Sequence, residues 1–327
     1  MNKIDHHAIF SIVVLAIFIS ESVGAEESRI IDLEMTSTLV PSPVKFSVLL
    51  PPDYESDSPP LPLLINLHGG GGNRDMLKTQ RAIFDDVWRD GSVPPMVVAM
   101  PSATERGFYM NFQNGSEKWE TFLTDEFLET LRRDFKVRTD AKGTMITGIS
   151  MGGMGSLRIA FKHPTTFGSV AGMEPGIEPV LKWSEIRQKH RFWRGDSLLQ
   201  KAYGKPIDED YWEANNPASI VVASAAKLRE SGLQIYVEAG DEDVFWLYEG
   251  AEFLHRTLWD QKVKHEYHLV RGADHVGRTV VPRTKEALRF LAQTLEPRTR
   301  DPIAERSRAR IDPLKHGLTE KDHYSLP

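Results

Sequence analysis

The chain has 327 residues, of which 40% are hydrophobic and 26% are charged, and its formal net charge is −6. This is enough apolar material for one large core or two ordinary ones, and the composition excludes a collagen, a disordered chain and a membrane bundle. A mildly acidic chain without a basic block is not expected to bind nucleic acid or an anionic membrane surface. The chain has no cysteine, which excludes disulfides, a thiol nucleophile and thiolate metal sites.

The first 25 residues have the pattern of a signal peptide. Lys3 precedes an apolar run over residues 8–19, which is too short to span a bilayer comfortably, and small residues end at Ala25. We therefore expect cleavage after Ala25, a secreted or periplasmic protein, and no stable membrane association afterwards. The alternative is an anchor that stays attached to the chain.

The rest of the chain alternates short apolar runs with amphipathic stretches. Continuous apolar runs are typical of strands buried on both faces of a parallel sheet. The expected strands are residues 44–50, 62–67, 96–100, 144–147, 169–172, 234–238 and 265–270. The expected helices are residues 119–135, 157–163, 248–259 and 283–295. The alternation predicts one α/β domain over residues 26–296, with a mostly parallel sheet flanked by helices.

Two segments depart from this alternation. Residues 175–217 are long, polar and aromatic and lie between two expected strands, so we expect an insertion over one end of the sheet. Such an insertion is either a functional lid or a peripheral helical decoration. Residues 297–327 are charged and have little to bury, which predicts an extended tail.

The sequence Gly148-Ile149-Ser150-Met151-Gly152 matches the G-x-S-x-G motif. It lies between an expected strand and a helical stretch, which is the context of a nucleophile elbow, a tight turn that exposes a reactive serine. The motif alone is weak, because a glycine-rich turn gives the same pattern by chance.

A second motif strengthens this interpretation. His68 and four glycines, residues 69–72, directly follow the expected strand LLINL. A loop of this type supplies a backbone N–H to an oxyanion hole, paired with the N–H of the residue after the nucleophile. We therefore expect Gly69 or Gly70 and Met151 to provide these donors, with His68 as a structural residue of the loop.

An acid and then a histidine should follow the serine in chain order. Asp241, Glu242 and Asp243 come directly after the expected strand QIYVE, and Asp243 is preferred, with Asp241 as the fallback. His275 follows the last expected strand in a glycine-containing loop, and we expect it to be the base that activates Ser150.

Together, the segments LHGGGG, KWETFLTDEF, GISMGGMGSLRIAFKHPTTFGSVAGM, GDEDV and GADH resemble the esterase D-type, feruloyl esterase-like superfamily of α/β-hydrolases, over roughly residues 45–295. This group includes acetylxylan esterases, S-formylglutathione hydrolases, enterochelin esterases and mycolyltransferases. The resemblance implies Ser150 as nucleophile, His275 as base, an Asp or Glu as acid, and a helix opened by Trp119-Glu120 behind the site. One departure is Glu174, where relatives often carry a small or polar residue. It could bind a substrate hydroxyl or a cation, or cap a turn.

The resulting expectation is an exported serine esterase that forms an acyl-serine and needs no metal or organic cofactor. Export favours acyl esters of carbohydrate, of feruloyl or acetyl type, as substrates. The alternatives are acyl transfer to a sugar, a peptidase of similar fold, and a non-catalytic binding protein on the same scaffold. Six aromatic residues are candidates for a substrate platform, although we expect most of them to pack under the insertion instead: Tyr109, Phe112, Trp183, Trp193, Trp246 and Tyr248.

Overall fold

A computed structural model describes residues 27–55, 57, 59–103, 107–296 and 301–316. The expected signal peptide and its cleavage point lie outside the described residues. Within the described part of the chain, no helix is long and apolar enough to cross a membrane.

The core of the fold is an eight-stranded sheet with the order β1-β2-β4-β3-β5-β6-β7-β8. β1 and β2 pair antiparallel, as do β2 and β4, and the remaining neighbours are parallel. The strands are β1 (Arg29–Met35), β2 (Val44–Leu50), β3 (Leu63–Leu67), β4 (Val97–Pro101), β5 (Thr144–Ile149), β6 (Ser169–Met173), β7 (Gln234–Gly240) and β8 (Glu266–Val270). The sheet confirms the expected mostly parallel α/β architecture.

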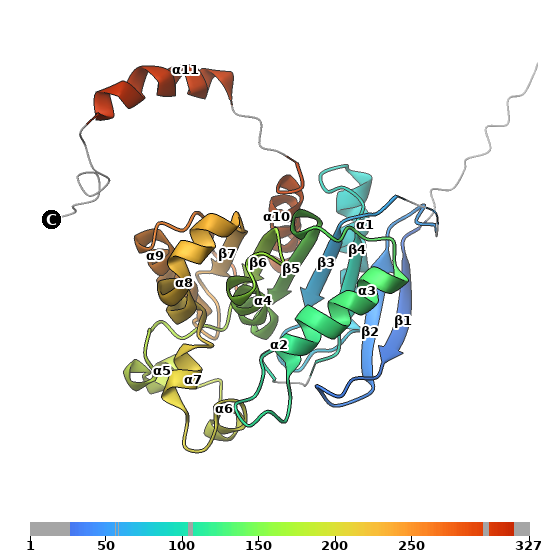
Figure 1. The fold of residues 1–327 in the computed structure, drawn as a ribbon, viewed down its shortest axis with the longest axis vertical. Coiled ribbons are helices and arrows are strands. Elements are labelled where there is room, and N and C mark those ends of the chain that lie inside the picture. The colour runs from blue at the N-terminus through green and yellow to red at the C-terminus, as the bar shows by residue number, and fades with distance from the viewer. Residues whose placement is uncertain (1–26, 56, 58, 104–106, 297–300, 317–327) are drawn as a thin grey trace, which may run out of the picture.

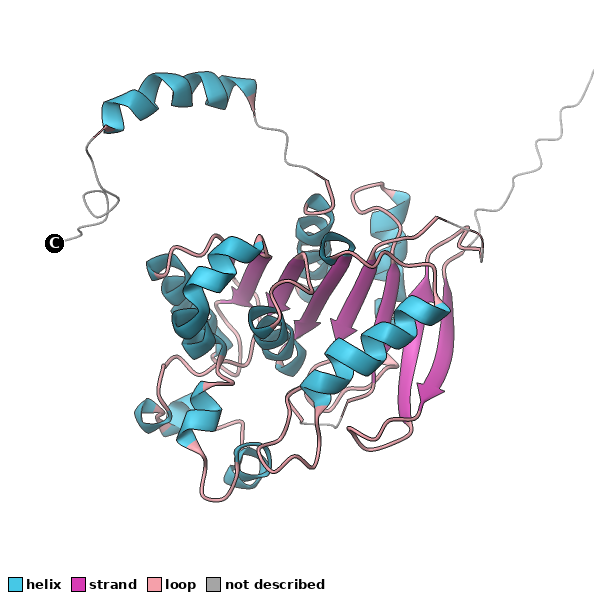
Figure 2. Ribbon diagram, viewed as in Figure 1, coloured by secondary structure: helices cyan, strands magenta, loops and turns pink. Residues whose placement is uncertain are grey.

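Helices cover both faces of this sheet (Figures 1 and 2). One face carries α1 (Met76–Arg89) and α10 (Val280–Gln293), which pack on alternate side chains such as Leu64. The other face carries α4 (Met151–Lys162), α8 (Pro217–Ser231), α9 (Leu247–Asp260) and the helical segment of residues 119–134. Leu63, Ile65 and Leu67 point to this second face, as the period of two in a strand requires.

The helical segment expected over residues 119–135 forms, but not as one regular helix. It consists of α2 (Trp119–Thr121), a π-helical turn η1 (Phe122–Phe127) and α3 (Leu128–Asp134). Glu120 at its start is buried and accepts hydrogen bonds from Lys162 (2.7 Å) and His163 (3.0 Å). Burial alone would raise the pKa of Glu120, but these two partners lower it. The segment is therefore anchored to the far end of α4.

Residues 175–217 form a cluster of short helices between β6 and α8. They are η3 (Trp183–Glu185), α5 (Gln188–Arg191), α6 (Asp196–Tyr203) and α7 (Glu209–Glu213). Figure 1 shows α5, α6 and α7 beyond the ends of the strands toward which the arrows point. The cluster is tied to residues 108–117, since Tyr211 Oη donates to the Asn111 carbonyl (2.7 Å) and Lys201 pairs with Glu117 (2.9 Å).

The C-terminal segment is not wholly extended, contrary to the expectation from composition. Residues 302–311 form α11 (Pro302–Ile311), followed by the 3-10 turn η4 (Asp312–Lys315). Asp301 caps the helix by accepting from the Ile303 N–H (2.8 Å), and Pro302 occupies the first turn. Figure 1 shows α11 lying apart from the sheet. Capping thus forms a helix here although no residue of α11 is buried.

Candidate active site

Ser150 occupies the tight turn between β5 and α4. Its backbone has φ 59° and ψ −116°, a conformation that L-residues adopt only when the surrounding structure imposes it. The Ser150 N–H donates to the Met173 carbonyl at the end of β6 (2.9 Å), and the Ser150 carbonyl accepts from Met154 (3.0 Å) and Gly176 (3.3 Å). The turn is therefore held on both sides in the strained shape that presents the serine side chain.

The glycines around Ser150 are required by close backbone contacts. A Cβ at Gly152 would lie 2.1 Å from the Leu67 carbonyl oxygen, and one at Gly153 would lie 2.3 Å from the Met173 carbonyl oxygen. α4 therefore begins at Met151, six residues earlier than the expected helix, despite the low helix propensity of glycine. Close packing of the helix against β3 and β6 outweighs this propensity.

We expect Gly152→Ala to lower the free energy of unfolding by about 3 kcal/mol, at the upper end of the range for overpacking. The clash is with the β3 backbone, which cannot move aside as a flexible side chain can. Gly195→Ala is the matched control, because a Cβ there meets no atom within 4 Å. Urea unfolding of both variants measures the difference. Equal stability of the two variants would contradict the assigned contact.

The loop after β3 lies against Ser150. A Cβ at Gly69 would be 3.5 Å from the Ser150 Cβ, whereas one at Gly70 meets nothing within 4 Å. The Gly72 N–H closes this loop on the Gly69 carbonyl (3.0 Å). Met151 is the first residue of α4, so its N–H has no acceptor within the helix. Gly69 thus lies beside the serine, and the N-terminus of α4, which includes the Met151 N–H, is the positive end of a helix dipole.

His68 is a structural residue of this loop. It is fully buried, its Nε2 accepts from the Ala103 N–H (3.2 Å), and its Nδ1 lies 2.8 Å from the Gly69 carbonyl. These partners assign the proton to Nδ1. Burial lowers the pKa of His68, so the ring is neutral at neutral pH. The Tyr109 hydroxyl, also buried, donates to the His68 carbonyl (2.9 Å).

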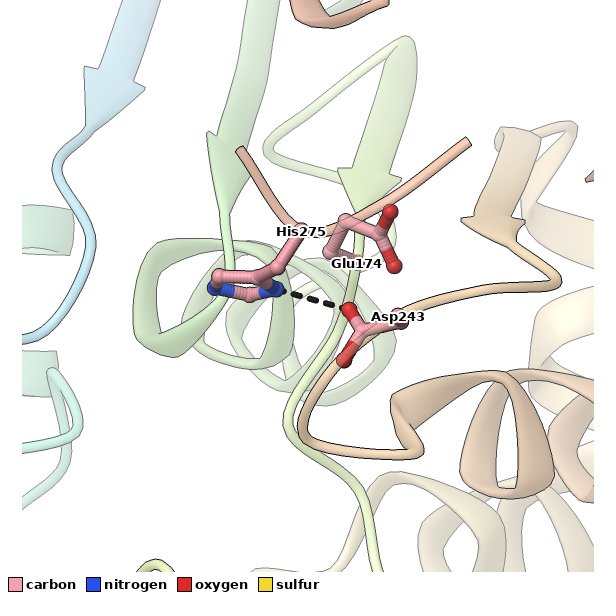
Figure 3. A group of neighbouring side chains, drawn as sticks. All are labelled: Glu174, Asp243 and His275. Atoms are coloured by element: carbon pink, nitrogen blue, oxygen red, sulfur yellow. Dashed lines mark hydrogen bonds and ion pairs between the residues drawn. The ribbon is translucent and has the colours of Figure 1, made fainter. Parts of the chain in front are cut away.

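The three carboxylates after β7 have different contacts. Asp243 Oδ2 lies 2.7 Å from His275 Nδ1, and both side chains are at least nine-tenths buried (Figure 3). Asp241 instead accepts from the Gly272 N–H (2.6 Å) and is exposed. Glu242 is also exposed, and its N–H binds the Ala273 carbonyl (3.0 Å). The structure therefore brings Asp243 to the histidine, while Asp241 ties the two loops together.

Asp243 is held as an ionised acceptor. Its Oδ1 accepts from the N–H groups of Phe245 (2.6 Å) and Leu247 (3.5 Å). Burial opposes ionisation, but the hydrogen bond from His275 and the neighbouring Glu174 carboxyl group lower the pKa of Asp243 overall. A charged carboxylate fixes the His275 tautomer with the proton on Nδ1 and leaves Nε2 free to accept a proton.

Sequence reasoning did not assign the buried ion network behind this pair. Arg283 on α10 makes two hydrogen bonds to Glu238 of β7 (2.6 and 2.7 Å), donates to the Asp274 carbonyl (2.9 Å), and contacts Glu174. All three charged side chains are at most 4% exposed. Burial alone would lower the pKa of Arg283, but the two carboxyl groups raise it. The network thereby fixes the loop that carries His275.

Glu174, Asp243 and His275 are the one group of three possible metal ligands found among the described residues, with ligand atoms within 4.8 Å of one another. Two of these groups bond to each other, and Glu174 contacts the Arg283 guanidinium, which is itself a cation. The set is therefore a hydrogen-bonded group, and we do not assign a metal site to it.

The expected aromatic platform is largely core. Tyr109 and Phe112 are buried, and Trp183 packs edge-on against Trp212, whereas Trp246 is 47% exposed. Five exposed apolar side chains, Trp246 among them, directly follow Asp243 or His275 in the chain or pack against residues that do. This rim consists of Phe192, Val244, Phe245, Trp246 and Val276, all exposed. Phe245 meets the His275 ring edge-on at 4.8 Å between centroids, and Phe192 lies 5.3 Å from Trp246.

The sheet order, the serine turn after β5, the carboxylates after β7 and the histidine after β8 define an α/β-hydrolase. A solved structure of a ferulic acid esterase has the same fold, with a TM-score of 0.68 and 20% identity over 83% of this chain and 100% of that chain. Residues 37–279 match the family model described as "Putative esterase", and the chain belongs to this family. The expected fold and superfamily are thus confirmed, and the protein is by family an esterase.

Curated relatives match over shorter stretches. An esterase of Mycobacterium tuberculosis (strain ATCC 25618 / H37Rv) is 28% identical over 181 residues, which are 52% of this chain and 38% of the relative. An endo-1,4-beta-xylanase/feruloyl esterase of Xylanibacter ruminicola is 31% identical over 116 residues, which are 33% of this chain and 15% of the relative. The matched region thus spans well under half the length of each of these relatives.

Proposed function

We propose that the protein is a serine carboxylic-ester hydrolase with Ser150 as nucleophile, His275 as general base and Asp243 as the acid that orients it. The observation that carries this proposal is the buried Asp243–His275 hydrogen bond of 2.7 Å, which lies beside Glu174. The residue before Glu174, Met173, accepts from the N–H of the strained Ser150 turn. A helix N-terminus and a glycine loop flank the same serine, which is the donor arrangement that ester cleavage needs.

In the first half-reaction, His275 Nε2 takes the proton of the Ser150 hydroxyl as Oγ attacks the ester carbonyl carbon. The carbonyl oxygen becomes an oxyanion, held by the N–H of Met151 and by that of Gly69 or Gly70. The tetrahedral intermediate then collapses, His275 gives its proton to the leaving alcohol, and an acyl-serine remains. The charged Asp243 stabilises the imidazolium that exists between these two proton transfers.

In the second half-reaction, water takes the place of the alcohol. His275 removes a proton from water, the resulting nucleophile attacks the acyl-serine, and the same donors hold the second oxyanion. Ser150 leaves with the proton from His275, and the carboxylic acid is released.

For the substrate, we propose acyl esters of carbohydrate with a feruloyl-type acyl group as the preferred form, and acetyl esters as the smaller alternative. The exposed rim around His275 supports a large apolar or aromatic acyl group, because aromatic side chains contribute through both area and ring geometry. The name of the Xylanibacter ruminicola relative includes a feruloyl esterase activity.

Trp246→Ala is expected to lower kcat/KM for methyl ferulate about tenfold, which corresponds to about 1.4 kcal/mol, and to leave p-nitrophenyl acetate hydrolysis within about twofold. Trp259→Ala is the matched control, because Trp259 is 54% exposed on the same helix, about 20 Å along it from Trp246. Equal losses on both esters, or equal losses in both variants, would contradict a role of the rim in acyl recognition.

A panel of p-nitrophenyl acetate, methyl ferulate and acetylated xylan tests the proposed function directly. We expect hydrolysis of at least one of these esters, with methyl ferulate preferred. If a sugar added as acceptor receives the acyl group faster than water does, the same site is an acyltransferase. No turnover of any ester by the folded protein would favour a non-catalytic binding protein.

We further propose that the protein is exported and loses residues 1–25. The support is the apolar run with small residues before Ala25. N-terminal sequencing of the protein purified after export is expected to begin at Glu26. A chain that keeps Met1 would contradict cleavage and favour a retained anchor.

A further inference from the structure

Glu174 is an acidic residue at a buried position, where ionisation of its side chain is unfavourable in free energy. It directly follows β6, adopts φ 42°, and is completely buried. Its N–H donates to the Glu238 carbonyl (2.9 Å), which continues the β6–β7 pairing and directs the side chain toward the β7 and β8 ends. Figure 3 shows its carboxyl group beside the Asp243–His275 pair.

The two oxygens of Glu174 have different surroundings. Oε1 accepts from the Gly240 N–H (2.9 Å) and contacts Arg283 Nη2. Oε2 is buried and, among the described residues, no donor reaches it. The Asp243 carboxylate, which is itself an acceptor, lies beside the Glu174 carboxyl group, with an oxygen of each within 4.8 Å of the other (Figure 3). Two facing acceptors in a buried site are unfavourable unless one of them carries a proton.

The charge count leads to the same conclusion. Arg283 is the one cation of the network, and Glu238 already binds it through two hydrogen bonds. If Glu174, Glu238 and Asp243 were all ionised, three negative charges would face one positive charge, which leaves a buried net charge of −2. A proton on Glu174 reduces this excess to −1, and the imidazolium formed at His275 during the reaction then neutralises it.

We propose that Glu174 is a protonated positioning residue that donates a hydrogen bond from Oε2 to the Asp243 carboxylate and so holds Asp243 against His275. The proton satisfies the one unpartnered oxygen of Glu174. It gives Asp243 one more donor besides His275 and the Phe245 N–H. Glu174 touches neither substrate nor Ser150 in this role and acts only through Asp243.

The charged and titratable groups that face Glu174 are Arg283 from α10, Glu238 from β7, Asp243 and His275 from the loops after β7 and β8, and Tyr267 from β8. Burial, followed by the neighbouring Asp243 carboxylate, raises the pKa of Glu174 to about 9, and Arg283 only partly opposes this. Glu174 is therefore neutral at pH 7 while Asp243 stays ionised.

If Glu174 is protonated, the free energy of unfolding depends on pH in a way that can be measured without an activity assay. Unfolded Glu174 ionises near its usual pKa of about 4.3, so the fold keeps a proton that the unfolded chain releases between that pH and about 9. The stabilising effect is complete below the unfolded pKa and is lost as pH rises through the folded pKa. In E174Q this term is absent, because glutamine does not titrate.

The experiment compares unfolding of the wild type and E174Q by urea from pH 5 to pH 9. We expect the folding equilibrium constant of the wild type to fall relative to E174Q by up to tenfold per pH unit. E238Q should flatten the pH slope of the wild type, because loss of the Glu238 charge leaves Arg283 free to pair with an ionised Glu174. If E174Q is less stable than the wild type by the same free energy of unfolding at every pH in this range, Glu174 is ionised. That result would overturn the proposal.

The activity readout depends on the proposed function. E174Q keeps an amide donor for Asp243, so kcat is expected within about threefold of the wild type, whereas E174A should lose 10- to 100-fold in kcat with KM changed less than twofold. The wild type should also lose activity above pH 9, and E174Q should not. Equal losses in E174Q and E174A would contradict positioning by a proton. If the wild type hydrolyses no ester, the proposed function fails, and the stability slopes still decide the state of Glu174.

Discussion

Ser150→Ala is expected to lower kcat for ester hydrolysis by about 10⁴- to 10⁶-fold, because no acyl-enzyme can form without the Oγ nucleophile. Hydrolysis of p-nitrophenyl acetate under saturating substrate measures the loss. The matched control is Ser116→Ala, which changes an exposed serine and should keep kcat within about twofold. Circular dichroism should show the same fold in both variants.

A Ser150→Ala variant that retains more than a few per cent of the activity would show that another group attacks the ester. The strain of the turn is not expected to change in this variant. Alanine keeps the backbone of the turn, which the Met173 carbonyl and the α4 N-terminus hold in place. We therefore expect the thermal midpoint of Ser150→Ala to stay close to that of the wild type.

Asp243→Asn is expected to lower kcat by about 10³- to 10⁴-fold, because an amide facing His275 Nδ1 favours the wrong tautomer and cannot stabilise the imidazolium. Asp241→Asn is the matched control two residues away. It weakens only an exposed hydrogen bond to the Gly272 N–H, so kcat should change less than tenfold. Parallel kinetics of the two variants decide between the two acids that the sequence left open. A larger loss in Asp241→Asn would reverse the assignment.

The central strands could be predicted because a strand that is buried on both faces has a continuous apolar run in its sequence. Leu63–Leu67 and Ser169–Met173 are fully buried and were expected within one residue of their observed bounds. β1 was not identified, because it is an edge strand with intermediate and exposed residues and a charged Asp32 at its centre. Its half-buried pattern gives a much weaker signal than that of a central strand.

Tertiary contacts explain the helices that the sequence placed wrongly. α4 starts among glycines because Gly152 and Gly153 must approach the β3 and β6 backbones, and propensity alone favours a later start. The aromatic residues of the 108–112 loop were candidates for a substrate platform, with packing under the insertion as the alternative. Tyr109 is buried because its hydroxyl has a partner in the His68 carbonyl, a contact across 41 residues that local patterns do not encode.

The sequence predicted where the site residues lie in the chain better than it predicted which hydrogen-bond partners they have. Chain order placed a serine, an acid and a histidine after three strands of the sheet, β5, β7 and β8, and the structure joins Asp243 to His275. The choice between Asp243 and Asp241 depended on one hydrogen bond in a tight turn. Arg283 and Glu238 could not be paired, because they lie 45 residues apart and each has an ordinary place on its helix or strand. An arginine in the first turn of α10, where the helix dipole disfavours a cation, was a signal available in the sequence.

Labelling with a fluorophosphonate probe tests the central claim most directly, because the probe phosphonylates only an activated serine. We predict that the folded protein incorporates one probe per chain and that peptide mapping places it on Ser150. Ser150→Ala should not react, and Asp243→Asn should react much more slowly than the wild type. A folded wild type that does not react, or that carries the probe on another serine while Ser150→Ala still labels, would contradict the assignment of Ser150 as the nucleophile.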